Sequence, residues 1–390
     1  MKILITTVFD YPHAGGLSTH VTTLKAGLEA RGHEVDIVSF SDAPSWKRKW
    51  YARGPSFVLN KLKKGKGIIW SRKARQKMLE ELIAERKGQG YDIINAQDVF
   101  ATFASIESGI PTVSTVHGYM AFEAVSAGSV IENSDEAKFL QEMEKKAFKS
   151  TRKVITVDQR IKDYVYNQAG VEGNAIRNFI DIHDFKPAVE RKSELRRQYG
   201  FKEDEQIFFV PRRLTKKNGV IYPALALPKV LEQFPNAKLV YAGMGEAYEE
   251  LKNLIAEKGL TENAQLLGAI PHSKVKDYFA LSDVVLVPSI HSAGVEEATS
   301  ISALEAMGSG VPLIACAVGG LKEIVEHEKD GLLVEERNVE QLSEAMIALL
   351  ENPTKGASLA EQARKKIEEQ YSHLAAAEKY EQIYLSALEK

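Results

Sequence analysis

The chain of 390 residues contains a single cysteine, Cys316, which cannot form a disulfide within the chain. We predict that Cys316 is a small apolar residue buried in a strand of a protein from a reducing compartment. No apolar run approaches the roughly 18 residues of a membrane-spanning helix. The apolar run in MKILITTVFD is too short for a signal peptide because it reaches Asp10 at once. These absences predict a cytoplasmic protein.

The chain also lacks the short motifs of several enzyme classes. It has neither a Walker-type phosphate loop nor a hydrolase nucleophile elbow. The nine histidines form no H-E-x-x-H pattern and no two aspartates stand two apart, so we expect no metal site and no cofactor. A formal net charge of −2 gives the whole chain no nucleic-acid signature, and no nucleic-acid partner is expected.

Short apolar runs alternate with helical patterns along the chain, in two series. The first series of expected strands is KILITTV (2–8), EVDIVSF (34–40), DIIN (92–95), TVSTV (112–116), KVITV (153–157) and AIRN (175–178). The second series is QIFFV (206–210), KLVYAG (238–243), QLLGAI (265–270), VVLVPS (284–289), PLIACA (312–317) and GLLV (331–334). This alternation predicts an α/β protein with two doubly wound, Rossmann-like domains of parallel strands that face a cleft. The polar segment 183–205 is the expected connection.

Loops that follow the strands of the first series carry two candidate site features. Gly15 and Gly16 follow the first strand and open a helix, where backbone amides can approach an anion; a plain turn is the alternative. The G-x-G-x-x-G pattern of dinucleotide-binding enzymes is absent there, which disfavours a nicotinamide oxidoreductase. His117 ends the strand TVSTV and is either a structural histidine or a site residue.

The first loop of the second series is rich in cations. The segment PRRLTKKNG (211–219) holds four Lys or Arg in nine residues at the end of its strand. Arginine forks and lysine charges at that edge suit a diphosphate. An ordinary solvated loop is the alternative.

Two glutamates stand eight residues apart in EEATSISALEAMGSGVP (296–312). If Ser300 caps a helix, Glu297 belongs to the preceding loop and Glu305 to the second helical turn. Both could then face one extended ligand with an anionic group at the helix N-terminus. The alternative is a solvated loop glutamate and an ordinary helix-surface glutamate. Together with the cationic loop, this arrangement suits a sugar nucleotide.

Positive charge and tryptophan concentrate in residues 41–90. This stretch holds 14 Lys or Arg against 4 Asp or Glu, a net of +10, which leaves −12 for the rest of the chain. It also holds all three tryptophans, Trp46, Trp50 and Trp70. Cationic side chains interleaved with aromatic ones suit an anionic membrane surface or a phosphorylated partner. The alternative is a solvent-exposed helical segment whose tryptophans pack on the domain.

From Glu297 to Glu305 the sequence resembles the E-x7-E motif of the GT4 family of retaining glycosyltransferases. Further resemblances follow the family's order: AGGLSTHV, ARGHEV, YDIINAQD, IPTVSTVHG, KVITVD, RNFIDIHDFKP, PRRLTKKNGV, LVYAGMGE, LGAIPHSKVKDYFALSDVVLVPS, LEAMGSGVPLIA, VGGLKEIV and GLLV. The resemblance implies the GT-B fold. It also implies an acceptor-side domain over residues 1–185, a donor-binding domain over 186–371, and a final helix, 372–390, that crosses back onto the first domain.

The resemblance implies four catalytic residues. His117 lies beside the donor sugar and Glu297 contacts the hydroxyls of that sugar. Arg213 and Lys217 bind the diphosphate, although Lys216 is a rival for the role of the lysine.

The remaining implied contacts bind the donor nucleotide. Gly15 and Gly16 lie near the donor phosphates, and Glu305 contacts the ribose. The phosphates accept hydrogen bonds from the backbone amides of Thr299, Ser300 and Ile301.

The implied reaction is the transfer of a hexose from a UDP- or GDP-type donor to a carbohydrate or lipid-linked acceptor, with retention and without a metal. Two departures from the family pattern bear on which sugar is transferred. The loop after Glu297 has no phenylalanine or second glycine, and Asn95 and Gln97 stand where two histidines are common. A nucleotide-sugar-binding protein without transferase activity and a sugar-nucleotide epimerase are the alternatives. Residues 41–90 would bring the protein to the inner face of the membrane.

Overall fold

The computed structural model describes residues 1–13, 16–292 and 299–389. It divides into two compact units, Met1–Asn178 with His373–Lys390, and Phe179–Ser372. Residues 179–185, which the sequence analysis assigned to the N-terminal domain, belong to the second unit because Ile180 and Phe185 are buried in its core. None of the helices in the described part of the chain combines the length and the apolar character of a transmembrane span.

The first unit is built on a six-stranded parallel sheet in the order β2-β1-β3-β4-β5-β6. Its strands are β1 (Lys2–Thr7), β2 (Glu34–Ser39), β3 (Ile93–Ala96), β4 (Thr112–Val116), β5 (Lys153–Thr156) and β6 (Gly173–Ala175). Its helices and helical turns are α1 (Gly16–Ala30), η1 (Phe40–Asp42), α2 (Ser45–Lys47), η2 (Arg48–Arg53), α3 (Gly54–Leu62), α4 (Lys66–Ala84), η3 (Lys87–Gln89), α5 (Val99–Ile106), α6 (Met120–Ser126), α7 (Asp135–Ser150), α8 (Gln159–Ala169) and α17 (His373–Leu388).

The second unit repeats this plan with the strand order β12-β11-β10-β7-β8-β9. Its strands are β7 (Gln206–Val210), β8 (Ala237–Tyr241), β9 (Ala264–Leu266), β10 (Val284–Val287), β11 (Leu313–Cys316) and β12 (Leu332–Val334). Its helices and helical turns are η4 (Val189–Arg191), α9 (Lys192–Gln198), η5 (Lys216–Asn218), α10 (Ile221–Leu231), α11 (Tyr248–Glu257), α12 (His272–Leu281), α13 (Ile301–Gly308), α14 (Leu321–Ile324), α15 (Val339–Glu351), α16 (Pro353–Lys366) and η6 (Ile367–Tyr371).

The predicted fold of two doubly wound α/β domains is confirmed. Strands such as β1 and β7 are apolar runs because helices cover both faces of each sheet, so Ile3, Leu4 and Ile5 are fully buried. Cys316 is buried in β11, as predicted. The last strand of the first series was misplaced: it spans Gly173–Ala175 and ends where the predicted run at residues 175–178 begins.

Each sheet reverses its strand order at one place. In the first unit β2 and β3 lie on opposite sides of β1, and in the second unit β8 and β10 lie on opposite sides of β7. Ligands of open α/β sheets bind beyond the carboxyl ends of the strands at such a reversal. Ligands are therefore expected to bind at the loops after β1 and β3 in the first unit, and at those after β7 and β10 in the second.

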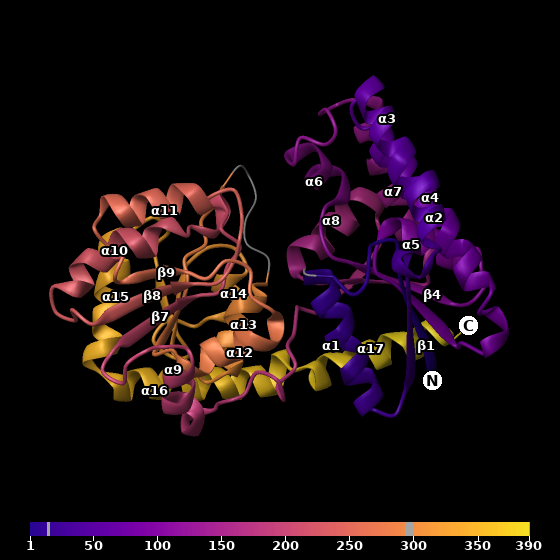
Figure 1. The fold of residues 1–390 in the computed structure, drawn as a ribbon. Helices are drawn as coiled ribbons and strands as arrows, with labels where there is room; N and C mark the ends of the chain where they lie inside the picture. Colours follow the sequence, from indigo (N-terminus) through magenta and orange to yellow (C-terminus); the bar gives the residue numbers. More distant parts are fainter. Residues whose placement is uncertain (14–15, 293–298, 390) are drawn as a thin grey trace. The chain divides into compact units, whose positions relative to one another are not determined.

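The last helix, α17, packs with the first helix, α1, although the two are at opposite ends of the chain (Figure 1). Tyr380 and Tyr384 of α17 are fully buried, and Asn95 Nδ2 of β3 donates a hydrogen bond to Tyr384 Oη at 2.6 Å. At the contact with α1, a side chain on Gly27 would collide with the carbonyl oxygen of His373. The first unit is therefore completed by the final residues of the chain.

Candidate functional site

Two loops and a helix start meet at the carboxyl ends of β7 and β10 in the second unit. Arg212 joins them. Its Nη1 donates to Ser300 Oγ at 2.9 Å, and its Nη2 donates to Asn218 Oδ1 at 2.7 Å and Ser289 Oγ at 3.0 Å. Arg212 is only 9% exposed, so these charge-assisted bonds replace the solvation of its charge. The buried guanidinium fixes the position of the cationic loop relative to the start of α13.

Sequence analysis missed Arg212 and selected its neighbour. Arg213 is exposed, whereas Arg212 points into the protein. A pair of adjacent arginines at a strand end does not reveal which one turns inward. The polar residues Asn218 and Ser289 were the available signal, because a buried arginine needs acceptors on its neighbours.

The cationic loop is held against β10 by its backbone. Ile290 N donates to the carbonyl oxygen of Lys217 at 2.8 Å. Gly219 adopts a positive φ of 62°, and a side chain there would collide with the carbonyl oxygen of Pro288. Arg213 is exposed and Lys217 half-buried, and neither makes an ion pair with any described residue. The loop thus presents uncompensated positive charge on a fixed backbone.

Ser300 is the N-cap of α13, as predicted, and Thr299 and Ser300 are both buried. Glu305 is only 5% exposed, so the alternative of an ordinary helix-surface glutamate is wrong. Its Oε1 lies 3.2 Å from Nε2 of His272, a residue of α12. Burial raises the pKa of Glu305, and the hydrogen bond to His272 offsets part of that rise. The same hydrogen bond raises the pKa of His272.

Glu297 and Gly15 lie outside the described residues. Gly16 is described and forms the exposed first residue of α1.

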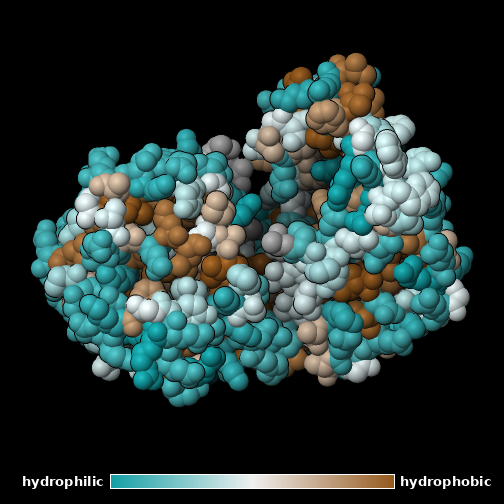
Figure 2. All heavy atoms as spheres, in the orientation of Figure 1, coloured by the Kyte–Doolittle hydropathy of each residue, from teal (hydrophilic) through white to brown (hydrophobic). Residues whose placement is uncertain are grey.

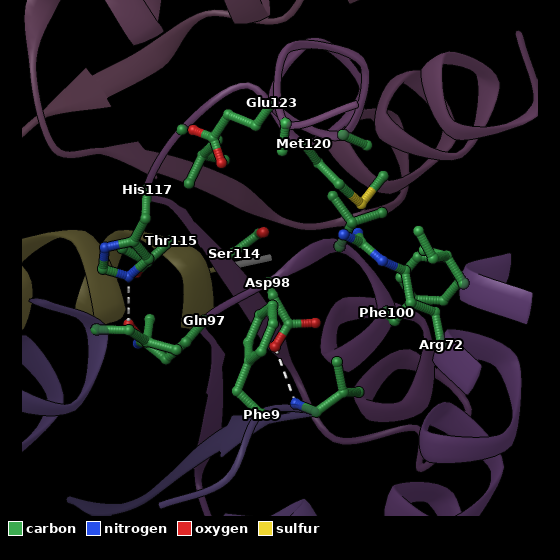
Figure 3. A pocket seen from close by; sticks show the side chains of 18 of the residues that line it. Phe9, Arg72, Gln97, Asp98, Phe100, Ser114, Thr115, His117, Met120 and Glu123 are labelled. Carbon is green, nitrogen blue, oxygen red and sulfur yellow. Dashed lines mark hydrogen bonds between the residues drawn. The ribbon is translucent and has the colours of Figure 1, made fainter. Parts of the chain in front are cut away.

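The first unit has a cavity of about 480 Å³ beyond the carboxyl ends of β1, β3 and β4 (Figure 3). We call it the first-unit cavity; residues that carry its polar character are Arg72, Gln97, Asp98, His117 and Glu123. His117 therefore lines a cavity, which distinguishes it from a histidine packed only for structure. Its Nε2 lies 2.9 Å from Gln97 Oε1, an acceptor, so Nε2 carries the proton.

His117 is electrically neutral at physiological pH. Burial and the neighbouring His20 ring, whose centroid lies 4.6 Å away, hold the pKa of His117 well below its usual value. Burial also lowers the pKa of His20 to about 4, and the Nε2 atom of His20 lies 3.2 Å from Tyr380 Oη of α17. A neutral His117 can exchange hydrogen bonds with a ligand but adds no positive charge.

The predicted residues thus form two groups, each within its own unit. The first unit holds Gly16 and His117. The second unit gathers the cationic loop and the start of α13, with Arg213, Lys217, Thr299, Ser300, Ile301 and Glu305.

Comparison with known proteins identifies the family. A profile described as Glycosyltransferase Family 4 matches residues 14–184, and one described as glycosyl transferases group 1 matches residues 191–366. An uncharacterised glycosyltransferase of Methanocaldococcus jannaschii is 29% identical over 100% of this chain and 99% of its own.

Two further comparisons agree. A GDP-mannose-dependent monoacylated alpha-(1-6)-phosphatidylinositol monomannoside mannosyltransferase of Corynebacterium glutamicum is 31% identical over 50% of this chain and 51% of its own. A solved structure of an Anabaena protein in complex with UDP and glucose covers 99% of this chain and 100% of its own, with a TM-score of 0.72 and 20% identity. The chain belongs to the GT4 family of glycosyltransferases and has the GT-B fold.

Proposed function

We propose that this glycosyltransferase uses a UDP- or GDP-activated hexose, retains its anomeric configuration and needs no metal ion. The observation that carries this proposal is the cationic loop 211–219, which Arg212 ties to the N-cap of α13. Arginine and lysine side chains beside free helix amides bind a diphosphate well, since both supply positive charge at short range. One relative is a GDP-mannose-dependent mannosyltransferase and one structural neighbour was solved in complex with UDP and glucose, which supports these two nucleotide classes.

In this proposal the donor lies along the predicted residues of the second unit. Arg213, Lys217 and the amides of residues 299–301 bind the two phosphates. Glu305 accepts a hydrogen bond from the ribose, with His272 holding the carboxyl in place. Glu297 binds the hydroxyls of the sugar.

The chemistry follows from where negative charge develops. As the bond between the anomeric carbon and the diphosphate breaks, the leaving oxygen gains charge that Arg213, Lys217 and the helix N-terminus stabilise. The acceptor oxygen attacks the same face of the sugar, and its proton passes to the departing phosphate oxygen. The neutral His117 contributes a hydrogen bond to the sugar.

A thermal-shift panel tests the donor class. UDP, GDP, ADP, CMP and NAD are compared at matched concentrations. A ligand present at about a hundred times its Kd stabilises the protein by roughly 2.7 kcal/mol, a rise of several degrees in Tm. We expect UDP or GDP to give the largest rise. A rise with NAD alone, or no rise with any nucleotide, contradicts the proposal; a rise without release of nucleotide from the matching donor favours a binding protein.

We also propose that η2 and α3 contact an anionic membrane surface, where a lipid-linked acceptor is available. Trp50, Phe57 and Leu62 are 67%, 65% and 77% exposed, and Figure 2 shows apolar residues gathered at the tip formed by α3. Lysines accompany them, and the Nζ of Lys61 lies 4.6 Å from the ring centroid of Phe57. Exposed aromatic and aliphatic side chains with adjacent cations are typical of interfacial binding.

Co-sedimentation with vesicles of phosphatidylcholine and phosphatidylglycerol at low salt tests this contact. We expect the wild type to bind and the double variant Trp50→Ala/Phe57→Ala to bind at least tenfold more weakly, because both lost side chains insert into the interface. Tyr166→Ala is the control, since Tyr166 is a 55% exposed aromatic residue on α8 of the same unit. If the wild-type protein does not sediment with the vesicles, the proposed membrane contact is wrong.

A further inference from the structure

Arg72 places a positive charge in the first-unit cavity, and no described residue forms a hydrogen bond or an ion pair with it. It lies on α4, and Figure 3 shows its guanidinium pointing into the cavity among the lining side chains. Among the described residues it makes no hydrogen bond and no ion pair. The ring centroid of Phe100 lies 5.8 Å from its Cζ, and Asp98, Glu144 and Glu123 stabilise its charge at longer range. A guanidinium carries five N–H donors and no acceptor. The donors of Arg72 are therefore available to a ligand.

The carboxylates around Arg72 are engaged elsewhere. Asp98 Oδ2 accepts hydrogen bonds from Val8 N and Thr7 Oγ1, both at 2.9 Å, and Asp98 Oδ1 accepts one from Ala101 N at 2.8 Å. Asp98 thereby caps α5 and joins β1 to β3. Asp98 therefore stabilises the charge of Arg72 at a distance but forms no ion pair with its guanidinium, whose donors stay available.

Two further glutamates approach the same region. Glu144 accepts from Met120 N and from Tyr164 Oη, each at 2.8 Å, and burial raises its pKa to about 7. Glu123 accepts from Tyr119 N at 3.2 Å through Oε1 alone. Glu123 is thus the one lining carboxylate with a spare oxygen, and it is the group that would favour a cationic ligand.

Gln97 adds a further free donor to the polar lining. Gln97 Nε2 is buried and has no hydrogen-bond partner among the described residues, while Gln97 Oε1 is taken by His117. The hydroxyls of Ser114 and Thr115 are bonded to Thr102 and Asn95. A ligand group that offers several acceptor oxygens would match this wall better than an alcohol would.

Apolar side chains make up much of the remaining surface, including Val8, Phe9, Ile68 and Met120. A cavity of about 480 Å³ accommodates a small molecule or the head of a larger one. Apolar walls also reduce the competition of water for a charged pair. A planar guanidinium in such surroundings recognises a carboxylate or a phosphate through two parallel hydrogen bonds.

We infer that the acceptor carries a carboxylate or phosphate group, and that Arg72 binds this anion in the first-unit cavity. The inference rests on the proposed transferase function and on the acceptor-side role that the family resemblance implies for the N-terminal domain. It assigns Arg72 as a determinant of acceptor specificity, since it discriminates anionic acceptors from neutral ones.

Four probes that share a benzene ring test the inference: phenyl phosphate, benzoate, benzyl alcohol and benzylamine. Binding to the full-length protein is measured by calorimetry. Hydrogen bonds to a charged group are strong enough that we expect one of the anions to bind about tenfold to a hundredfold more tightly than benzyl alcohol. Phenyl phosphate and benzoate also show which anion fits. Equal binding of all four, preference for benzylamine, or no measurable binding of either anion at millimolar concentration overturns the inference.

Variants locate the anion. Arg72→Met should abolish the preference for anions, and Arg72→Lys should keep part of it because a lysine retains the charge without the fork. Arg75→Met is the matched control. Arg75 lies on the same helix and is held by Val8 O at 3.1 Å and by the Phe40 ring at 4.2 Å, outside the cavity lining. An anion preference that survives in a folded Arg72→Met or Arg72→Lys protein at full strength also overturns the assignment.

The nucleotide thermal shift separates the two proposals. A wild type that responds to UDP or GDP but shows no anion preference contradicts the inference about Arg72 alone. A wild type that prefers anions but responds to no nucleotide contradicts the proposed transferase function, and with it the identification of the anion as part of an acceptor.

Discussion

Replacing Arg213 by alanine is expected to slow the release of nucleotide from the donor about a hundredfold to a thousandfold, with the protein still folded. Arg213 is exposed and makes no ion pair among the described residues, so its removal leaves no buried charge unpaired. Its proposed contact strengthens as the diphosphate leaves, and a contact of this kind affects kcat more than donor binding. The measurement is kcat for nucleotide release from the UDP- or GDP-sugar whose nucleotide gives the larger thermal shift.

Arg197→Ala is the matched control for this result. Arg197 is an exposed arginine on α9 of the same unit, away from the loop 211–219, and its removal should leave kcat within about twofold of wild type. Lys216→Ala and Lys217→Ala, measured alongside, identify the lysine that assists Arg213. An Arg213→Ala protein that retains more than a tenth of the wild-type kcat removes this arginine from the proposed stabilisation of the leaving group.

Tyr384→Ala is expected to destabilise the first unit by about 3–5 kcal/mol, the usual range when a large buried aromatic side chain is truncated. Tyr384 is fully buried in α17, and its hydroxyl accepts a hydrogen bond from Asn95 Nδ2 at 2.6 Å. The substitution opens a cavity between α17 and the sheet and leaves the Asn95 amide without that partner. Tyr384→Phe removes only the hydroxyl and should cost about 1–3 kcal/mol.

Urea unfolding followed by tryptophan fluorescence measures this effect in the relevant unit. All three tryptophans, at positions 46, 50 and 70, belong to the first unit, so the signal reports that unit directly. Leu385→Ala, at a neighbouring position of α17 that is 50% exposed, should change the free energy of unfolding by less than about 0.5 kcal/mol. If Tyr384→Ala unfolds at the same urea concentration as wild type, α17 does not stabilise the first unit.

The strands could be predicted because each depends on a short stretch of sequence. A run such as QIFFV at residues 206–210 reads as a buried parallel strand without knowledge of its neighbours, and the structure places β7 there. The end of the first series was harder, since β6 has only three residues and its sequence, GNA, has little apolar character. The helix start at Ser300 was predictable from adjacent residues, but its side chain makes no capping hydrogen bond and instead accepts one from Arg212.

The site could be predicted only in part. Glu305 was selected by its spacing from Glu297, but its burial and its contact with His272, 33 positions earlier, depend on how α12 packs beside α13. Arg212 shows the same limit, since its three acceptors are spread from residue 218 to residue 300. Local sequence does not determine which of two adjacent arginines finds those acceptors.

By itself, the sequence determined two doubly wound domains, the cationic loop and the start of α13, to which we assign donor binding as a proposal. Apolar periodicity, capping residues and charge are properties of neighbouring residues, so they can be read along the chain. The tertiary structure alone decided that Arg212 is buried and that Arg72 enters a cavity with His117. The reason is that a polar side chain takes its charge state and its partners from groups brought together by packing, and those groups are far apart in the sequence.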